Sequence, residues 1–205
     1  MAVLVALAPA LSFASSPRLP PAGVGLVGLS VGYRMVPDAP FAATAAKAGR
    51  PMSSHAFGAP TALVPFSYRG DGGWSLVVEL GYGSDHYQLA DAGAVDLQTV
   101  TLQAGAQWAF DLGLDRLEPF AEAGVGYYLS TFTASGGPQN VEANSSGGFL
   151  GAGLRYALTD EVGLTLEERY ALATVNLAGV ADASVGGDTV ALGMYYVWRE
   201  EPDGS

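Results

Sequence analysis

The sequence predicts an all-β fold, an eight-stranded antiparallel up-and-down transmembrane β-barrel. Three observations carry this prediction. Large apolar and small side chains alternate along eight segments, tight turns alternate strictly with longer connections, and 28 glycines accompany a charged fraction of only 14%. Alternation with a period of two places successive side chains on opposite faces of a strand, and this composition favours glycine-punctuated strands over helices.

The first four predicted strands span residues 23–35, 55–69, 73–83 and 96–110. The first alternates valine, leucine and tyrosine with glycine, serine and Arg34. The second is the least regular, because Pro60 and Pro65 lie inside it and a closed barrel has no free edge for a missing donor. We expect a bulge or a shifted strand boundary there. The third and fourth strands place tryptophan, leucine, valine and tyrosine on one face and small or polar residues on the other.

The last four predicted strands span residues 117–130, 149–158, 161–172 and 189–198. In the last, Val190, Leu192, Met194, Tyr196 and Trp198 share one face. The tight turns are 69–73, 112–116 and 158–161, whereas 36–55, 84–96, 133–147 and 175–188 read as longer loops. Long loops at one end, with short turns and both chain ends at the other, are typical of an up-and-down membrane barrel.

The large apolar face is expected to point outward into lipid. A soluble lipocalin-like barrel would also have about eight alternating strands. Its outer wall would here consist of glycine, alanine, serine and threonine with few charges, which is poorly solvated. Small residues instead suit the narrow interior of an eight-stranded barrel. Aromatic side chains near strand ends then form the lipid-interface girdles, and they are Trp74, Tyr82, Trp108, Phe110, Tyr156 and Tyr170.

Most ionisable strand residues share the small-residue face, so we expect an ion-pair network that fills the lumen. Isolated buried charges are costly and pairing offsets much of that cost. Arg155 is expected near Glu122 and Glu167, with Gln107 close by. A proton or ion path is the functional alternative to a structural plug. The predicted lumen network comprises Glu79, Glu122, Arg155, Glu167 and Arg169, with Arg34 also directed inward.

Glu168 is the exception, because it falls on the lipid-facing side of its strand. A charge at the midplane of a membrane is unfavourable by up to about 3 kcal/mol. A local bulge, or a strand displaced toward the interface, would remove the conflict.

The chain ends have a separate organisation. The apolar start, followed by Ser12, Phe13 and Ala14, predicts a signal peptide over residues 1–14 with an atypical n-region. A first apolar strand is the alternative reading of these residues. Residues 15–22 are then an N-terminal periplasmic segment, residues 23–199 the barrel, and residues 200–205 a C-terminal periplasmic tail.

Two stretches resemble a known family. LEPFAEAGVGYYLS (117–130) resembles the fifth strand of the small OmpA-like and opacity-type outer-membrane barrels, and GMYYVW (193–198) resembles their terminal-strand assembly signal. The resemblance implies a bacterial outer-membrane location and recognition of Gly193, Tyr196 and Trp198 by the barrel-assembly machinery. Ala191 stands where these relatives often have a polar residue, and REEPDGS follows the terminal aromatic residue.

The expected function is a non-enzymatic surface barrel that contacts its surroundings through long loops and supports the outer membrane. Its expected partners are outer-membrane lipids, it needs no cofactor or metal, and a monomer is the default state. A net charge of −11 and the lack of a basic cluster exclude nucleic acid. The chain has no cysteine, so disulfides and thiolate metal sites are excluded.

Two alternative functions remain on the same barrel. A lipid-modifying enzyme would need a serine and histidine pair, and Ser84, Asp85 and His86 are adjacent, but alternating side chains diverge. A conduit for small apolar solutes would need a dry or laterally open lumen.

Two loop features have ordinary interpretations. Asp85, Asp91 and Asp96 make an acidic loop that either is simply solvated or holds divalent cations. The RGD at 69–71 is ordinary turn chemistry rather than an adhesion motif.

Overall fold

The computed structural model describes residues 19–36, 42–43, 46–47, 49, 51–55, 58–90, 93–134, 141–177 and 181–199. The expected signal peptide (1–14) and the expected tail (200–205) lie outside these residues, as does Asp91. In the part of the chain that is described, no helix is long and apolar enough to cross a membrane.

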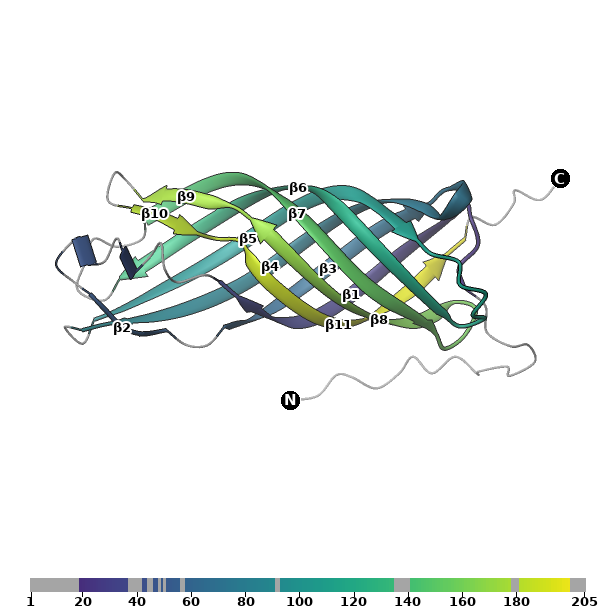
Figure 1. The fold of residues 1–205 in the computed structure, drawn as a ribbon, viewed down its shortest axis with the longest axis horizontal. Helices are drawn as coiled ribbons and strands as arrows, with labels where there is room; N and C mark the ends of the chain where they lie inside the picture. The colour runs from purple at the N-terminus through teal and green to yellow at the C-terminus, as the bar shows by residue number, and fades with distance from the viewer. Residues whose placement is uncertain are drawn as a thin grey trace.

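Within the described residues, eight long strands close into an antiparallel barrel (Figure 1). Each pairs with its neighbours in chain order, and the last returns to the first, which confirms the predicted fold. The eight strands are β1 (Val24–Met35), β3 (Ala59–Arg69), β4 (Trp74–Leu89), β5 (Ala94–Ala109), β6 (Leu117–Ala134), β7 (Val141–Ala157), β8 (Val162–Leu172) and β11 (Gly187–Trp198).

Shorter elements extend the two ends of the barrel. β2 (Met52–His55) pairs with the end of β4, and β9 (Thr174–Leu177) forms a hairpin with β10 (Ala181–Ser184). All three lie at one end, which we call the loop end (Figure 1). The opposite, short-turn end carries the connections 70–73, 110–116 and 158–161, the first of which includes the 3-10 helix η1 (Asp71–Gly73). The RGD motif therefore belongs to the end of β3 and the turn after it.

The strands are staggered around the barrel. The chain of paired residues that begins at Val24 passes through all seven other strands and returns to β1 at Arg34, ten residues further along the same strand. A stagger of this kind requires strands tilted by about 35–45° from the barrel axis. Its consequence is that residues distant in sequence, such as Arg69, Glu122 and Arg169, lie on one continuous path.

Side-chain exposure follows the predicted alternation through the central part of the barrel. In β11, Val190, Leu192, Met194, Tyr196 and Trp198 are all exposed on the outer wall, and the residues between them point inward and are buried. A contiguous wall of exposed leucine, valine and aromatic side chains is unfavourable in water and favourable in lipid.

At the loop end the polarity of the two faces is inverted. His86 and Gln98 face outward, while Tyr87, Leu97 and Phe132 point inward and are buried. This is the arrangement of a soluble barrel, so the strands continue beyond the lipid-facing zone. The inward side chains form an apolar cluster of Tyr87, Val95, Leu97, Tyr128, Phe132, Ala173, Val175 and Val185.

Two predicted loops are consequently wrong in their extent, and the other two, 36–55 and 175–188, contain β2 and most of the β9–β10 hairpin. Residues 84–96 and 133–147 were expected to be loops, but β4 continues to Leu89, β5 begins at Ala94, β6 continues to Ala134 and β7 begins at Val141. The reason is the inversion of polarity: the apolar residues change from one parity to the other, so a pattern that follows a single parity ends there.

The two prolines of β3 produce no bulge. Pro60 pairs with Tyr33 and Pro65 pairs with Glu79 in an unshifted register. The ladder between β1 and β3 instead omits two successive pairs, at Gly28 and Leu29, and resumes in the same register. The expected bulge is therefore absent, but the alternative of a misplaced boundary is confirmed for Pro60, because β3 begins at Ala59 and not at residue 55. The barrel accommodates Pro65 by losing local pairing.

Candidate functional site: the charged lumen and the lipid-facing wall

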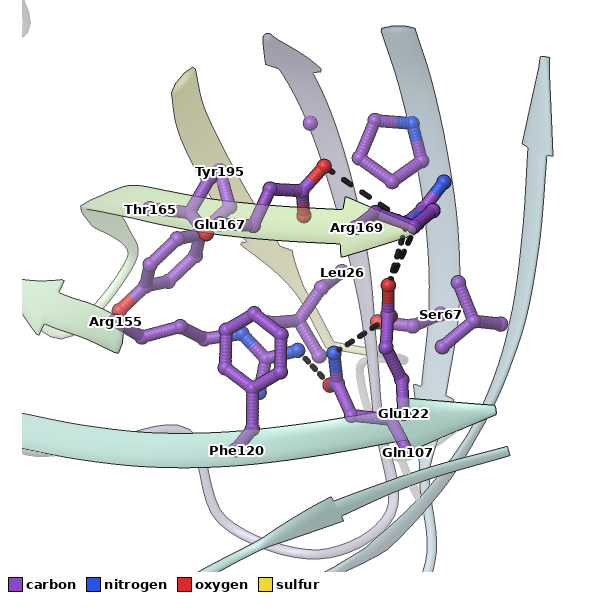
Figure 2. A pocket seen from close by; sticks show the side chains of 13 residues that line it. Leu26, Ser67, Gln107, Phe120, Glu122, Arg155, Thr165, Glu167, Arg169 and Tyr195 are labelled. Carbon is purple, nitrogen blue, oxygen red and sulfur yellow. Dashed lines mark hydrogen bonds and ion pairs between the residues drawn. The ribbon is translucent and has the colours of Figure 1, made fainter. Parts of the chain in front are cut away.

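Arg169 is the centre of the buried polar network in the lumen (Figure 2). Its guanidinium forms an ion pair with Glu79, and its Nη2 lies 2.7 Å from Oε1 of Glu122. Nη1 donates a hydrogen bond of 2.7 Å to Oε1 of Gln103, and Glu167 lies 3.8 Å away. Three carboxylates surround one buried cation, so Arg169 alone does not balance their charge, and Oε2 of Glu79 and Oε1 of Glu167 have no hydrogen-bond partner among the described residues.

Inward-facing glycines make room for this cation. Gly151 is the Cα partner of Glu122 on β6 and of Arg169 on β8. A Cβ at this position would lie 2.7 Å from Oε1 of Glu122. The ring of Phe149 packs over Gly124 in the same way and lies 4.8 Å from the Arg169 guanidinium carbon, in a cation–π contact. The small-residue face is therefore the space that the larger lumen side chains occupy.

Arg155 forms a second cluster, nearer the short-turn end. Its Nη1 donates a 2.9 Å hydrogen bond to Oε1 of Glu118, and its Nη2 donates to Oε1 of Gln107. Oε2 of Glu118 lies 2.5 Å from Nη1 of Arg69, so this carboxylate bridges two arginines. The Gln107 amide also donates to Glu122 at 3.3 Å, which joins the two clusters.

The carboxylate partner of Arg155 differs from the expected one. Glu122 and Glu167 interact with Arg169, whereas Arg155 pairs with Glu118, its direct Cα partner across β6 and β7. Glu118 and Arg69 were both missed in the sequence. Glu118 shares the inward parity of Glu122, which could have revealed it, but Arg69 begins the RGD turn and was assigned to the turn.

A third buried ion pair lies where the lumen meets the loop end. Nη2 of Arg34 lies 2.5 Å from Oδ2 of Asp85, and Nη1 donates to the carbonyl of Val185 at 3.4 Å. The expectation of an acidic loop containing Asp85 is therefore wrong, because Asp85 is buried within β4. Asp96 lies on the outer surface, where its Oδ1 is 2.6 Å from Nδ1 of His86.

Ser84, Asp85 and His86 do not converge. Asp85 points into the barrel and is ion-paired with Arg34, while His86 is exposed on the outside. Within the described ranges, no group of three histidine, aspartate or glutamate side chains gathers to hold a metal ion.

Apolar clusters occupy part of the barrel interior toward both ends. Val24, Leu26, Tyr195 and Val197 cluster at the short-turn end, opposite the larger cluster at the loop end. Between them lie two small cavities, of about 40 Å³ and about 30 Å³, and Arg169 lines both. Each has room for a few water molecules. Figure 2 shows the larger cavity with Glu122, Arg155 and Arg169 around it.

The lipid-facing wall carries the predicted aromatic residues. Trp74, Tyr82, Phe110, Tyr156 and Tyr170 are exposed on it. Trp108 is half-buried, because its ring packs edge-on against Trp74 with 4.5 Å between the ring centroids.

The three residues of the expected assembly signal lie on β11. Gly193 faces inward against Ser30, its Cα partner on β1, while Tyr196 and Trp198 are exposed outside.

Glu168 remains on the outer wall. It is exposed between Leu166 and Tyr170, and its Cα partners are Ala152 and Val190. Both ladders run through Glu168 without a register shift, so the expected bulge is absent. Tyr170, one of the predicted interface aromatic residues, is the next outward-facing residue of β8 toward the loop end, so Glu168 lies nearer the loop end than the short-turn end.

Comparisons with known proteins agree with this architecture. The family model described as "Outer membrane protein beta-barrel domain" matches residues 2–197. Neisserial surface protein A has a similar structure, with a TM-score of 0.57 and 17% sequence identity over 84% of this chain and 96% of that chain.

Two further solved structures have the same fold. Ail of Yersinia pestis, in complex with the heparin analogue sucrose octasulfate, has a TM-score of 0.54 and 12% identity over 86% of this chain and 99% of that chain. OprG of Pseudomonas aeruginosa has a TM-score of 0.53 and 14% identity over 90% of this chain and all (100%) of that chain. No curated protein matches the sequence closely enough to count as a relative.

Proposed function

Since the chain belongs to the family of outer-membrane protein beta-barrel domains, located in the bacterial outer membrane, we propose that it is a non-enzymatic barrel with a side-chain-filled lumen. Its role is to stabilise the membrane and to present the loop end to the cell's surroundings. The observation that carries this proposal is the continuous buried network around Arg169, with an apolar cluster toward each end of the barrel.

The filled lumen supports a structural role over transport. A path for ions or solutes would have to pass the buried Arg169 guanidinium, which lines both small cavities of the interior. The two cavities beside Arg169, of about 40 Å³ and about 30 Å³, have room for a few water molecules each. A typical small-molecule site has a volume of roughly 300–1,000 Å³.

The described surface at the loop end is polar and carries charges of both signs. Asp96 and Glu142 are exposed there, as is Lys47, and Asp96 pairs with His86. Ail is described in complex with the heparin analogue sucrose octasulfate. The mixed charges of this chain's loop end favour no single class of charged partner.

Conductance and surface accessibility test the proposal. Protein purified from the outer-membrane fraction is expected to migrate differently on gels with and without boiling and to show no robust single-channel conductance in planar bilayers. Sustained conductance steps would contradict the filled lumen.

A single cysteine introduced at Thr133, exposed near the end of β6, should react with a membrane-impermeant maleimide on intact cells. A cysteine at Asp71 should stay protected, and the reverse pattern would contradict the orientation.

A further inference from the structure

The described outer wall has a large hollow at its short-turn end. It has a volume of about 580 Å³ and crosses four neighbouring strands, β11, β1, β3 and β4. Large apolar side chains form its sides, and the backbone at Gly25 lies between them. We call it the Gly25 groove. Its lining is Gly25, Leu26, Val27, Phe66, Ser67, Tyr68, Leu76, Val78, Tyr196 and Trp198.

The groove exists because one side chain is missing from a row of large ones. Gly25 is the Cα partner of Tyr68 on β3 and of Trp198 on β11, two exposed aromatic residues. Further along β1, the outward positions carry Val27, Leu29, Val31 and Tyr33. The Trp198 ring lies over Gly25, since a Cβ at Gly25 would be only 3.2 Å from its Cε3, and the Trp198 and Tyr68 side chains both line the hollow.

The shape and chemistry of the groove fit a single hydrocarbon chain. It runs from Trp198, the last residue of β11, to Val78, four residues along β4 from Trp74. This direction leads from the aromatic interface toward the membrane interior, as an acyl chain does. No charged residue is among its lining residues, so it offers nothing to a headgroup charge, while the phenol and indole groups of Tyr68 and Trp198 suit the headgroup boundary.

We propose that the Gly25 groove binds one acyl chain of a phospholipid as a saturable site, distinct from the lipid that surrounds the rest of the wall. The assignment to the periplasmic leaflet rests on the proposed orientation, because the short-turn end then faces the periplasm. Tyr196 and Trp198, expected as the assembly signal, thereby acquire a second role in the folded barrel as one wall of a lipid site.

The test measures lipid retention by native mass spectrometry. Folded protein in detergent is titrated with phosphatidylethanolamine and, separately, with phosphatidylglycerol. In each titration we expect the first bound lipid molecule to bind at least tenfold more tightly than the second bound molecule. The affinity of this first molecule should differ little between the two headgroups. Gly25→Leu should abolish this first, tighter step. The control Gly148→Leu adds the same side chain to the outer wall away from the groove, where the nearest atom to its Cβ is 3.6 Å away.

A second variant and a second readout keep the test decisive. Val27→Phe narrows the groove from a lipid-facing position. It replaces Gly25→Leu if the Gly25→Leu protein does not fold, as judged by loss of the boiling-dependent gel shift. In a Trp74→Phe, Trp108→Phe background, Trp198 is the one remaining tryptophan of three. Its fluorescence should be quenched at low mole fractions of phospholipid with brominated acyl chains, and Gly25→Leu should shift quenching to higher fractions.

Equal lipid retention by the wild type, Gly25→Leu and Gly148→Leu would overturn the site and leave only surrounding lipid. This outcome is separate from failure of the proposed function, because retention in detergent depends neither on conductance nor on orientation in the cell. Tight binding together with maleimide labelling at Asp71 would keep the site but move it to the other leaflet.

Discussion

Gly151 stands between Glu122 and Arg169 as the Cα partner of both, and the carboxylate and guanidinium meet across it at 2.7 Å. The absence of a side chain on β7 is thus a condition for the ion pair between β6 and β8. In this barrel the lumen glycines belong to the polar network as much as the charged residues do.

Replacing Gly151 by leucine should break this arrangement. The new side chain would occupy the space of the Glu122 carboxylate and leave buried charge unpaired, which costs about 3–5 kcal/mol. The free energy of unfolding, from urea titration in lipid vesicles, measures the loss. The control Ala152→Leu places the same side chain one residue away on the lipid-facing wall and should change stability little. Equal effects would contradict the role of Gly151.

Removing the Arg169 guanidinium should lower the free energy of unfolding, and neutralising the carboxylates around it should restore part of that loss. Arg169→Met leaves Glu79, Glu122 and Glu167 together without their shared cation, and we expect a loss of about 3–5 kcal/mol of unfolding free energy. Adding Glu79→Gln and Glu122→Gln should recover part of that loss, because buried amides need no counterion. Failure of the triple variant to recover stability would show that packing of Arg169 dominates over its charge.

Glu168 offers a stabilising substitution. It faces lipid between Leu166 and Tyr170, so Glu168→Leu should raise the free energy of unfolding by about 1 kcal/mol in vesicles, since acidic side chains are disfavoured on this surface. Glu167→Leu, one residue earlier but inside the lumen network, should lower it. A loss of stability in Glu168→Leu would indicate that the carboxylate has a partner in the membrane.

The inversion of polarity at the loop end gives a paired test in β5. Leu97 is buried in the loop-end cluster, and Val100 is exposed on the lipid-facing wall. Leu97→Ala should cost about 2–5 kcal/mol of unfolding free energy, as expected for a buried leucine, and Val100→Ala should cost much less. A larger loss of unfolding free energy for Val100→Ala than for Leu97→Ala would mean that Leu97 faces outward and Val100 faces the interior.

The terminal aromatic residues can be tested separately for assembly and for stability. Tyr196→Ala with Trp198→Ala should reduce the amount of protein inserted in cells several-fold if these residues form the assembly signal. Spontaneous refolding into detergent needs no assembly machinery and should proceed for the same variant. The control Met194→Ala removes another exposed side chain of β11. Equal insertion of both variants would exclude a signal in Tyr196 and Trp198.

The strand pattern of the central barrel could be read from the sequence. Alternation in β4 and β11 identifies both faces, because each side chain of a strand meets either lipid or the lumen. The inward direction of Glu79, Glu122, Arg155, Glu167 and Arg169 followed from parity alone. The choice of lipid for the outer side followed from the small side chains and few charges of the other face.

Partners within the lumen depended on the register instead. Arg155 faces Glu118 because β6 and β7 pair at those residues, and Arg69 reaches Glu118 only through the stagger of the closed barrel. Register depends on how hairpins close and how the first strand meets the last. Parity specifies the face of a side chain but not its height in the lumen.

The length of the strands and the Gly25 groove were likewise decided by the tertiary structure. The continuation of β4 and β5 past the lipid zone reverses which face is apolar, and a pattern based on one polarity stops there. The hollow at Gly25 requires Tyr68 and Trp198 on either side of it, from strands 43 and 173 residues away. The sequence by itself determined which side of the wall each residue faces; closure of the barrel decided which residues meet, because only closure brings distant strands into register.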